Sequence, residues 1–335
     1  MELNKIFTSH MVFPAQKPIR VYGKGQGKAE IKFAGQKCIV MSDKADWMAE
    51  LEPMEYGGPY FMEINFEDKK IVLEDIYIGE VYLFSGQSNM AFKMNESNTP
   101  FKLYKSNDKL RIYSIDKIAK PDYYNASDGW VACRKECIEK WSALAYLAGN
   151  EISECKDIAI GIIVCYQGES VIESWVPEGS FQKIGINISD EDKFENHFLD
   201  WNKEGALYNF ALSQVIPYSI SAVVWYQGES DATEAEGHVY AEELCELIKI
   251  WRNDFCDDNL LFVIIQLADF VDRVALGWQE MGWPLIQKAQ MEISSKTHGV
   301  KTVISRDICE NDEIHPSTKD KLAMRIAEVL LNKKN

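Results

Sequence analysis

Ser88 lies in the segment GQSNM (86–90), directly after an apolar run that is typical of a buried strand. A strand-to-helix turn at this point would expose the hydroxyl and point the backbone N–H of Ser88 toward an anion bound above the sheet. This geometry suits a nucleophile. A serine that follows a glycine also commonly caps a helix, and the local sequence leaves that alternative open.

His315 is the best-placed general base among the five histidines of the chain. It lies in the segment NDEIHP (311–316), just before the last helical stretch. Asp312 precedes it by three residues, and an acid at this spacing can fix the imidazole tautomer while the other ring nitrogen faces a serine. The alternative is a solvated surface histidine.

The pentapeptide YQGES occurs at 166–170 and again at 226–230, each time after an apolar run. An ester hydrolase stabilises the oxyanion of a tetrahedral intermediate with backbone amides at glycine and with side-chain amides. Gly168 and Gln227 could supply such donors. The alternatives are a tight turn at each glycine and, for Glu169 and Glu229, a carboxylate bonded to the neighbouring backbone.

Four near-continuous apolar runs, at 78–86, 158–165, 220–228 and 260–268, predict strands that are covered on both faces. Amphipathic helical stretches at 239–253 and 319–332 lie between or after them. The sequence therefore predicts an α/β domain over residues 77–335, with a parallel sheet in a three-layer α/β/α arrangement. The polar segment 95–128 is expected to be an irregular excursion over the carboxyl edge of the sheet, where ligands bind in such folds.

Residues 1–76 have a different pattern. Short runs that alternate apolar with polar residues are separated by glycines or charged turns. This pattern predicts a small all-β sandwich domain ahead of the larger one.

The chain has 335 residues, with 36 Lys plus Arg against 52 Asp plus Glu and a net charge of −16. The negative charge disfavours nonspecific binding to nucleic acid or to an anionic membrane. No apolar run reaches the roughly 18 residues of a membrane span, and the first residues lack the pattern of a signal peptide. We therefore expect a cytoplasmic protein, whose oligomeric state the sequence leaves open.

Several catalytic signatures are absent, namely G-x-S-x-G, H-E-x-x-H and G-x-x-x-x-G-K-[ST]. Cys133 and Cys137 are spaced as one helical turn, but no second pair of ligands lies nearby, so helix packing is favoured over a zinc site. The sequence predicts neither a metal nor an organic cofactor.

The order GQSNM, IGIIVCYQGESVIESW, WYQGESD and DEIHP resembles the sialate O-acetylesterase family of SGNH hydrolases. The resemblance spans the whole chain, because the segment IFTSHMVFPAQKPIRVYG and the junction VLEDIYIGEVYLFSGQSNM are similar to the small β domain and linker of bacterial family members. It implies an SGNH-type, flavodoxin-like catalytic domain.

The resemblance also implies roles for individual residues. Ser88 is expected to be the nucleophile, His315 the general base and Asp312 its orienting acid. The oxyanion hole is expected to comprise the Ser88 and Gly168 N–H groups and the Gln227 side chain. The family pattern Asp-Asp-Ile-His is replaced by Asp312-Glu313-Ile314-His315, which keeps Glu313 as a rival acid, and Trp-Gly-Gly is replaced by Gln-Gly-Glu at 167–169. Substrate contacts are expected from motif neighbours: Gln87, Asn89, Trp175 and Glu229.

The expected activity is that of a serine esterase that removes O-acetyl groups from sugars through an acetyl-enzyme. Sialate recognition needs cations for the carboxylate, and the chain holds only seven arginines, so acetylated xylan or hemicellulose oligosaccharides are comparable candidates. One alternative is a carbohydrate-binding protein that keeps the fold but has lost turnover. Another is a lipid or thioester hydrolase, which needs a long apolar groove.

Overall fold

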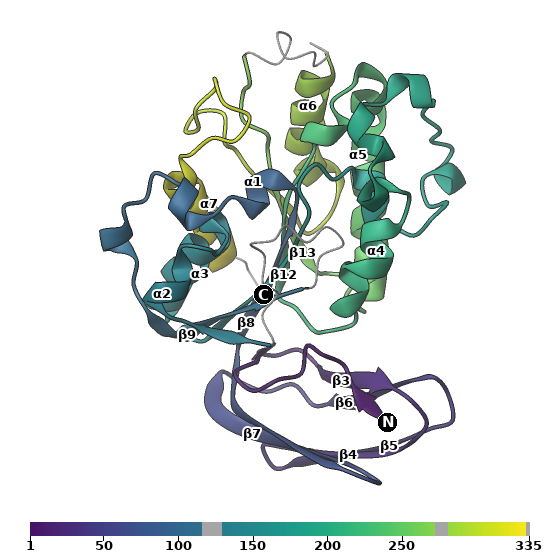
Figure 1. Ribbon diagram of the computed structural model, residues 1–335, viewed down its shortest axis with the longest axis vertical. Helices are drawn as coiled ribbons and strands as arrows, with labels where there is room; N and C mark the ends of the chain where they lie inside the picture. The colour runs from purple at the N-terminus through teal and green to yellow at the C-terminus, as the bar shows by residue number, and fades with distance from the viewer. Residues whose placement is uncertain (116–128, 272–280, 333–335) are drawn as a thin grey trace.

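The computed structural model describes residues 1–115, 129–271 and 281–332 (Figure 1). A strand-rich part formed by the first residues lies at one end of the molecule, and strands flanked by helices form the rest. The α/β fold expected from the sequence is thus the fold observed. The strands of the first part are β1 (Glu2–Leu3), β2 (Val12–Pro14), β3 (Ile19–Lys24), β4 (Gly27–Phe33), β5 (Gln36–Ser42), β6 (Asp46–Leu51) and β7 (Gly57–Phe66).

The strand β8 (Lys70–Gly86) belongs to both parts of the molecule. Its first half pairs antiparallel with β7, and its second half pairs in parallel with strands of the helix-flanked part. The sequence predicted a strand that begins near residue 78, after a domain boundary at residue 76, and both positions fall inside this one strand.

Six parallel strands form the central sheet in the order β9-β11-β8-β12-β13-β14, and β10 pairs antiparallel with β9 at the edge. The apolar runs produce buried strands because helices cover both faces. Their bounds are β9 (Asn107–Ser114), β10 (Val131–Cys133), β11 (Ile160–Tyr166), β12 (Ala222–Tyr226), β13 (Leu261–Ile265) and β14 (Val300–Val303).

β9 corrects the expectation that segment 95–128 is irregular. This strand pairs in parallel with β11, and residues 116–128 lie outside the described part of the chain. Arg111 interrupts its apolar pattern, yet the arginine side chain is only 3% exposed. It is buried because it pairs with Asp75 at 2.7 Å and lies 4.3 Å from the centre of the Tyr77 ring. The strand could not be predicted from its local sequence, because the charge of Arg111 is compensated by a residue that is distant in the chain.

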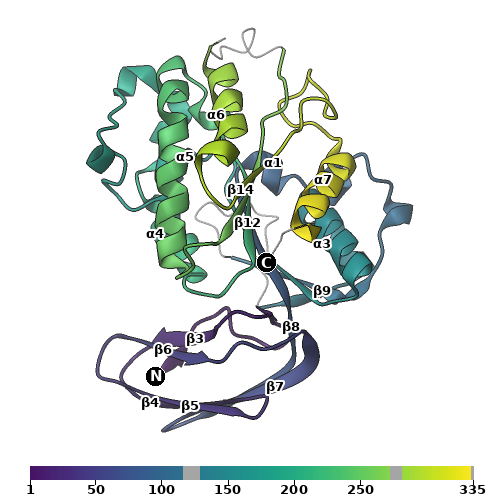
Figure 2. The same cartoon turned by 180° about the vertical axis from the view of Figure 1, so that it is seen from behind.

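The longer helices divide between the two faces of the sheet (Figures 1 and 2). One face carries α3 (Ala143–Lys156) and α7 (Lys319–Leu331), and the other carries α5 (Glu234–Asp254) and α6 (Gly282–Lys296), with the short helix α4 (Ala206–Phe210) on the side of α5 and α6. The helical stretches expected at 239–253 and 319–332 correspond to α5 and α7. In the described residues, no helix combines the length and apolarity needed to cross a membrane.

Short helices fill the connections. They are α1 (Ser88–Ala91), α2 (Lys135–Ile138) and the 3-10 turns η1 (Met94–Glu96), η2 (Phe101–Leu103), η3 (Ile172–Trp175), η4 (Gln182–Ile184), η5 (Asp190–Asp192), η6 (Glu195–Phe198), η7 (Asp200–Asn202), η8 (Leu212–Gln214) and η9 (Glu229–Asp231).

Strand register brings the sequence motifs to one level at the carboxyl edge of the sheet. Gly86 at the end of β8 is the register partner of both Tyr166 on β11 and Tyr226 on β12. The segment GQSNM and both QGES segments therefore leave the sheet side by side, on either side of the central strand. Carboxyl ends of neighbouring parallel strands are where α/β proteins bind ligands.

Gly86 makes this convergence possible because its backbone lies against β12. Its φ is +131°, and a Cβ added there would lie 2.0 Å from the carbonyl oxygen of Tyr226. Both the left-handed backbone and the close approach require glycine.

We predict that Gly86→Ala lowers the free energy of unfolding by about 3 kcal/mol or more, through strain and displacement of β12. Guanidinium unfolding followed by tryptophan fluorescence measures this. Gly185→Ala is the matched control, because Gly185 also has a positive φ of +87° but has no atom within 4 Å of an added Cβ. The control should lose only about 1 kcal/mol. Equal losses in the two variants would mean that the contact with Tyr226 is unimportant.

Candidate active site

The hydroxyl of Ser88 and the imidazole of His315 meet at the carboxyl edge of the sheet. The Nε2 atom of His315 lies 2.8 Å from the Oγ atom of Ser88, a hydrogen bond between residues 227 positions apart in the chain. Ser88 begins α1 after β8, and His315 comes from the loop that leads into α7. Ser88 is partly buried and His315 is exposed, so the pair is open to solvent.

The surroundings of His315 favour the neutral imidazole. Partial desolvation lowers the pKa of His315, and the Lys319 ammonium lowers it further, while the Glu96 carboxylate acts in the opposite direction. A neutral imidazole can accept a proton from a hydroxyl at neutral pH.

Gly168 lies beside Ser88, as the sequence predicted for a backbone donor. A Cβ added to Gly168 would lie 3.9 Å from the Cβ of Ser88. Asn202 fixes the loop that carries Gly168, because its Nδ2 donates to the Glu169 carbonyl at 2.7 Å and its Oδ1 accepts from the Val171 N–H at 3.1 Å. The sequence did not identify Asn202, since nothing in its local pattern distinguishes it from other polar loop residues.

Gln227 is completely buried, and its amide is already bonded within the protein. Its Nε2 donates to the Ser170 carbonyl at 2.9 Å and to the Asp231 carboxylate, and its Oε1 accepts from the Tyr240 hydroxyl at 2.9 Å. The side chain therefore has no amide hydrogen left for an oxyanion in this conformation. Its expected place in the oxyanion hole is not supported by these contacts.

Neither candidate acid contacts the base. Asp312 and Glu313 are both exposed. Within the described part of the chain, the His315 side chain is hydrogen-bonded to Ser88 and to neither of these acids. The orienting role of Asp312, with Glu313 as rival, thus stays a prediction.

The four expected substrate contacts are buried. Gln87 is 3% exposed, Asn89 2%, Glu229 1% and Trp175 0%. A saccharide cannot reach such side chains without displacing the protein around them. Their expected contact with the sugar therefore has no support in the structure.

Their partners show what these buried side chains do. Trp175 packs edge-on against Trp225 and Trp251 in the core, and the buried side-chain amide of Gln87 lies 3.3 Å from the backbone nitrogen of Gly228. These contacts fasten the motif segments to one another and to the core. Sequence motifs alone do not separate such a role from substrate binding.

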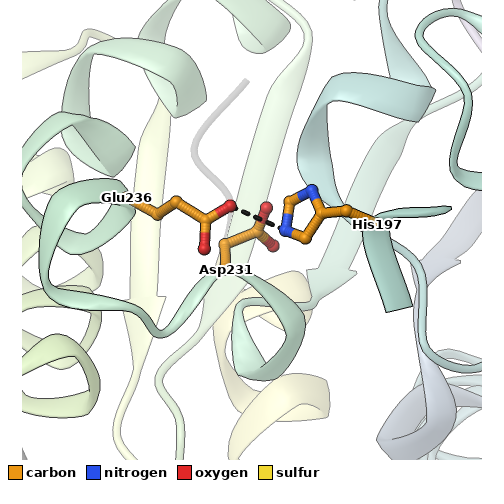
Figure 3. A group of neighbouring side chains, drawn as sticks. All are labelled: His197, Asp231 and Glu236. Atoms are coloured by element: carbon orange, nitrogen blue, oxygen red, sulfur yellow. Dashed lines mark ion pairs between the residues drawn. The ribbon is translucent and has the colours of Figure 1, made fainter. Parts of the chain in front are cut away.

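A second cluster of titratable side chains comprises His197, Asp231 and Glu236 (Figure 3). His197 Nε2 is 2.7 Å from Glu236 Oε1, and Asp231 lies beside both residues, all three being buried. Three such ligand types could hold a metal ion. However, Asp231 already accepts from the Ile172 N–H at 3.0 Å and from Gln227, and Glu236 accepts from Thr233 at 2.8 Å. These bonds fit an imidazolium held between carboxylates better than a metal centre.

Burial and mutual repulsion alter the proton affinity of this cluster. Burial, together with the Glu236 charge, raises the pKa of Asp231 from 3.8 to about 8. Burial is the largest single influence on the pKa of His197 and lowers it, but the hydrogen bond to Glu236 and the charges of Glu236, Asp231 and Glu173 together outweigh burial, and the net shift is upward. The folded protein therefore holds protons here that the unfolded chain would release.

A cavity of about 1660 Å³ lies elsewhere, lined by residues of the β part such as Arg20 and by residues near β13 and β14 such as Asn259 and Gly299. Neither Ser88 nor His315 lines it. This cavity is therefore separate from the serine–histidine pair.

The fold and the site together define a class: an α/β protein with a serine–histidine pair at the carboxyl edge of its parallel sheet. Residues 78–332 match the family described as carbohydrate esterase, sialic acid-specific acetylesterase. The chain belongs to this family of carboxylic ester hydrolases, and the resemblance drawn from its motifs is confirmed.

Relatives agree with this assignment. The chain is 24% identical to human sialate O-acetylesterase over 87% of its length, and 23% identical to the mouse enzyme over 84%. It spans 62% of the length of each of these relatives. Among solved structures, a carbohydrate acetylesterase from Xanthomonas citri is 25% identical, with a TM-score of 0.82 over 97% of this chain and 73% of that one. A protein from Arabidopsis thaliana, 18% identical, shares the fold with a TM-score of 0.50 over 76% of this chain and 98% of that one.

The His197–Asp231–Glu236 cluster gives a prediction about stability. Because the folded state binds more protons than the unfolded state between the ordinary and the raised pKa values, stability falls as the pH rises toward and through about 8. We expect the melting temperature to drop by a few degrees between pH 7 and pH 9. Glu236→Gln should flatten this dependence, since the Glu236 charge raises both pKa values.

Differential scanning fluorimetry from pH 6 to pH 9.5 measures the effect. Glu242→Gln is the matched control, because Glu242 lies exposed on the same helix. If Glu236→Gln and Glu242→Gln keep the same pH dependence as the unaltered protein, the cluster is not its source.

Proposed function

We propose that this protein is a serine esterase that hydrolyses O-acetyl esters on carbohydrates through an acetyl-enzyme. The observation that carries the proposal is the hydrogen bond between Ser88 Oγ and His315 Nε2. Membership in a carbohydrate esterase family and the similarity to sialate O-acetylesterases support it.

The chemistry proceeds in two half-reactions. His315 Nε2 takes the proton of Ser88 as Oγ attacks the acetyl carbonyl carbon, and a tetrahedral oxyanion forms. The C–O bond to the sugar then breaks, and the departing sugar oxygen receives the proton from the imidazolium. A water molecule repeats the attack on the acetyl-Ser88 ester with the same base, which releases acetate and restores the serine.

Two backbone groups are proposed as the oxyanion donors, the N–H of Ser88 and the N–H of Gly168. Among the described residues, neither N–H donates to another backbone carbonyl outside regular helices and strands. Donors that are free and held by rigid loops are worth more than flexible ones, because they need no reorganisation when the charge forms.

We further propose that residues 77–335 form a three-layer catalytic domain of the SGNH type and that residues 1–76 form a β-sandwich domain ahead of it. The parallel sheet with helices on both faces supports the first assignment. The strand-only character of the first residues supports the second.

The substrate is proposed to be a neutral acetylated saccharide, such as an acetylated xylan or hemicellulose oligosaccharide, in preference to an acetylated sialic acid. A sialate carboxylate is best bound by a free guanidinium. Each arginine that the structure describes is already bonded within the protein: Arg20 to Glu50, Arg111 to Asp75, Arg134 to Asp108, Arg252 to the Leu260 and His298 carbonyls, Arg306 to Asp269 and Arg325 to Asp307.

Removing the nucleophile or the base should abolish turnover. We expect Ser88→Ala and His315→Ala each to lower kcat for acetate release from p-nitrophenyl acetate by about 10³-fold or more. Ser295→Ala, an exposed serine on α6, should leave kcat unchanged. Retained turnover in Ser88→Ala would refute the proposal.

The natural substrate class is tested on the unaltered protein by comparing acetate release from acetylated xylo-oligosaccharides and from O-acetylated sialic acid. A higher kcat/KM for the neutral oligosaccharide is expected. The reverse preference would transfer the assignment to sialates. Saccharide binding without acetate release would instead favour a carbohydrate-binding protein that has lost turnover.

The acid that orients the imidazole is identified by comparing Asp312→Asn with Glu313→Gln. The motif spacing predicts that Asp312→Asn lowers kcat by about 10²-fold or more, since a misoriented imidazole loses the required tautomer. Glu313→Gln should change kcat by less than about three-fold. Steady-state kinetics on p-nitrophenyl acetate measure both, and a larger loss in Glu313→Gln would exchange the two roles.

A further inference from the structure

Lys319, the first residue of α7, is a lysine with no solvent exposure. Its Nζ donates to Asn89 Oδ1 at 2.7 Å and lies 4.6 Å from the centre of the Phe92 ring. Lysines are rarely buried completely unless they have a partner. The cost of removing this ammonium from water points to a role that an apolar side chain would not fill.

Asn89 uses its whole amide group to join three segments. It follows Ser88 directly, its Oδ1 accepts from Lys319, and its Nδ2 donates to Glu229 Oε1 at 2.6 Å and to the Ile314 carbonyl at 2.9 Å. Ile314 precedes His315. One side chain therefore connects the segment of the nucleophile to the peptide next to the base.

The third member, Glu229, comes from the second QGES segment, at the end of β12. It is 1% exposed, and its carboxylate faces the Asn89 amide. Burial raises the pKa of Glu229 to about 7 and lowers the pKa of Lys319 to about 8. A buried pair of opposite charges joined through an amide is weak evidence for stability, because desolvation offsets the attraction, but it fixes geometry.

The loop that carries His315 is also closed on itself. Glu310 accepts from the hydroxyls of Ser317 at 2.9 Å and Thr318 at 2.8 Å, so the loop moves as one unit. The bonds of Asn89 to Ile314 and Lys319 then fix that unit relative to α1.

We propose that Lys319, Asn89 and Glu229 form a buried bridge that holds the imidazole of His315 at bonding distance from Ser88. The charge of the Lys319 ammonium also lowers the pKa of this imidazole, after the larger effect of burial. The three side chains are positioning residues, which act through Ser88 and His315 and do not touch the sugar. The proposal rests on the esterase function proposed above for the kinetic part of its test.

The charged groups that act on the His315 imidazole come from two elements, Lys319 on α7 and Glu96 on η1. Asp312 and Glu313, on its own loop, are exposed, and Ser88 on α1 contributes a neutral hydroxyl. Replacing Lys319 by an uncharged side chain therefore removes the charge that opposes protonation and leaves Glu96, which favours it. The pKa of His315 must then rise.

The test compares Lys319→Met with Lys321→Met, since Lys321 is an exposed lysine on the same helix. We expect Lys319→Met to lower kcat by about ten-fold or more, as small displacements of catalytic groups do, and to move the acid limb of kcat/KM to higher pH. Lys321→Met should match the unaltered protein in both. A Lys319→Met protein with an unchanged kcat and an unchanged acid limb would overturn the proposal.

Asn89→Ala supplies an independent variant if Lys319→Met does not fold. A positioning role predicts a lower kcat with KM changed by less than about three-fold. A raised KM with an unchanged kcat would show instead that Asn89 binds substrate, and would overturn the proposal.

The imidazole itself gives a readout that needs no turnover. NMR titration of the histidine rings, with the His315 signal assigned from its loss in His315→Gln, should show a higher pKa for His315 in Lys319→Met than in Lys321→Met. If the unaltered protein shows no esterase activity, the proposed function is refuted, but the NMR titration still tests the bridge. An identical His315 titration in the two lysine variants would refute the electrostatic part of the bridge.

Discussion

The hydrogen bond between Ser88 and His315 imposes the main constraint on this fold. It joins residues 227 positions apart, and its length of 2.8 Å leaves little tolerance in the segments that carry them. The serine is fixed by the end of the central strand β8. The histidine comes from a loop whose chain has passed through every later strand of the sheet. Errors in strand register or helix packing would therefore be transmitted to this one distance.

Buried polar groups supply a precision of positioning that apolar packing alone would not. Apolar side chains are nondirectional and can slide, whereas an amide that uses its oxygen and both hydrogens has one position. Asn89 is bonded in this way beneath the serine, and Asn202 is bonded similarly beside Gly168. The burial of Lys319 and Glu229 costs desolvation free energy, so their presence is better explained by geometry than by stability.

The sequence revealed the parts of this arrangement that depend on local pattern. Apolar runs predicted the central strands, the 3.6-residue period predicted α5 and α7, and motif spacing brought out Ser88, Gly168 and His315. The sequence failed where distant residues decide the outcome. β9 was missed because the charge of Arg111 is satisfied by Asp75, and β8 was divided in two because its pairing partners change along its length.

The same limit explains why motif residues were assigned to the sugar. Gln87, Asn89, Gln227 and Glu229 are close to the reacting groups in sequence, but their side chains are buried, and those of Asn89 and Gln227 bond to backbone and to other side chains, whereas Glu169 is exposed. A site whose buried polar groups position Ser88 and His315 has few of these groups left to contact a substrate. For the acetylated saccharide proposed as substrate, we therefore expect recognition by side chains on the loops around the carboxyl edge of the sheet, outside the motifs.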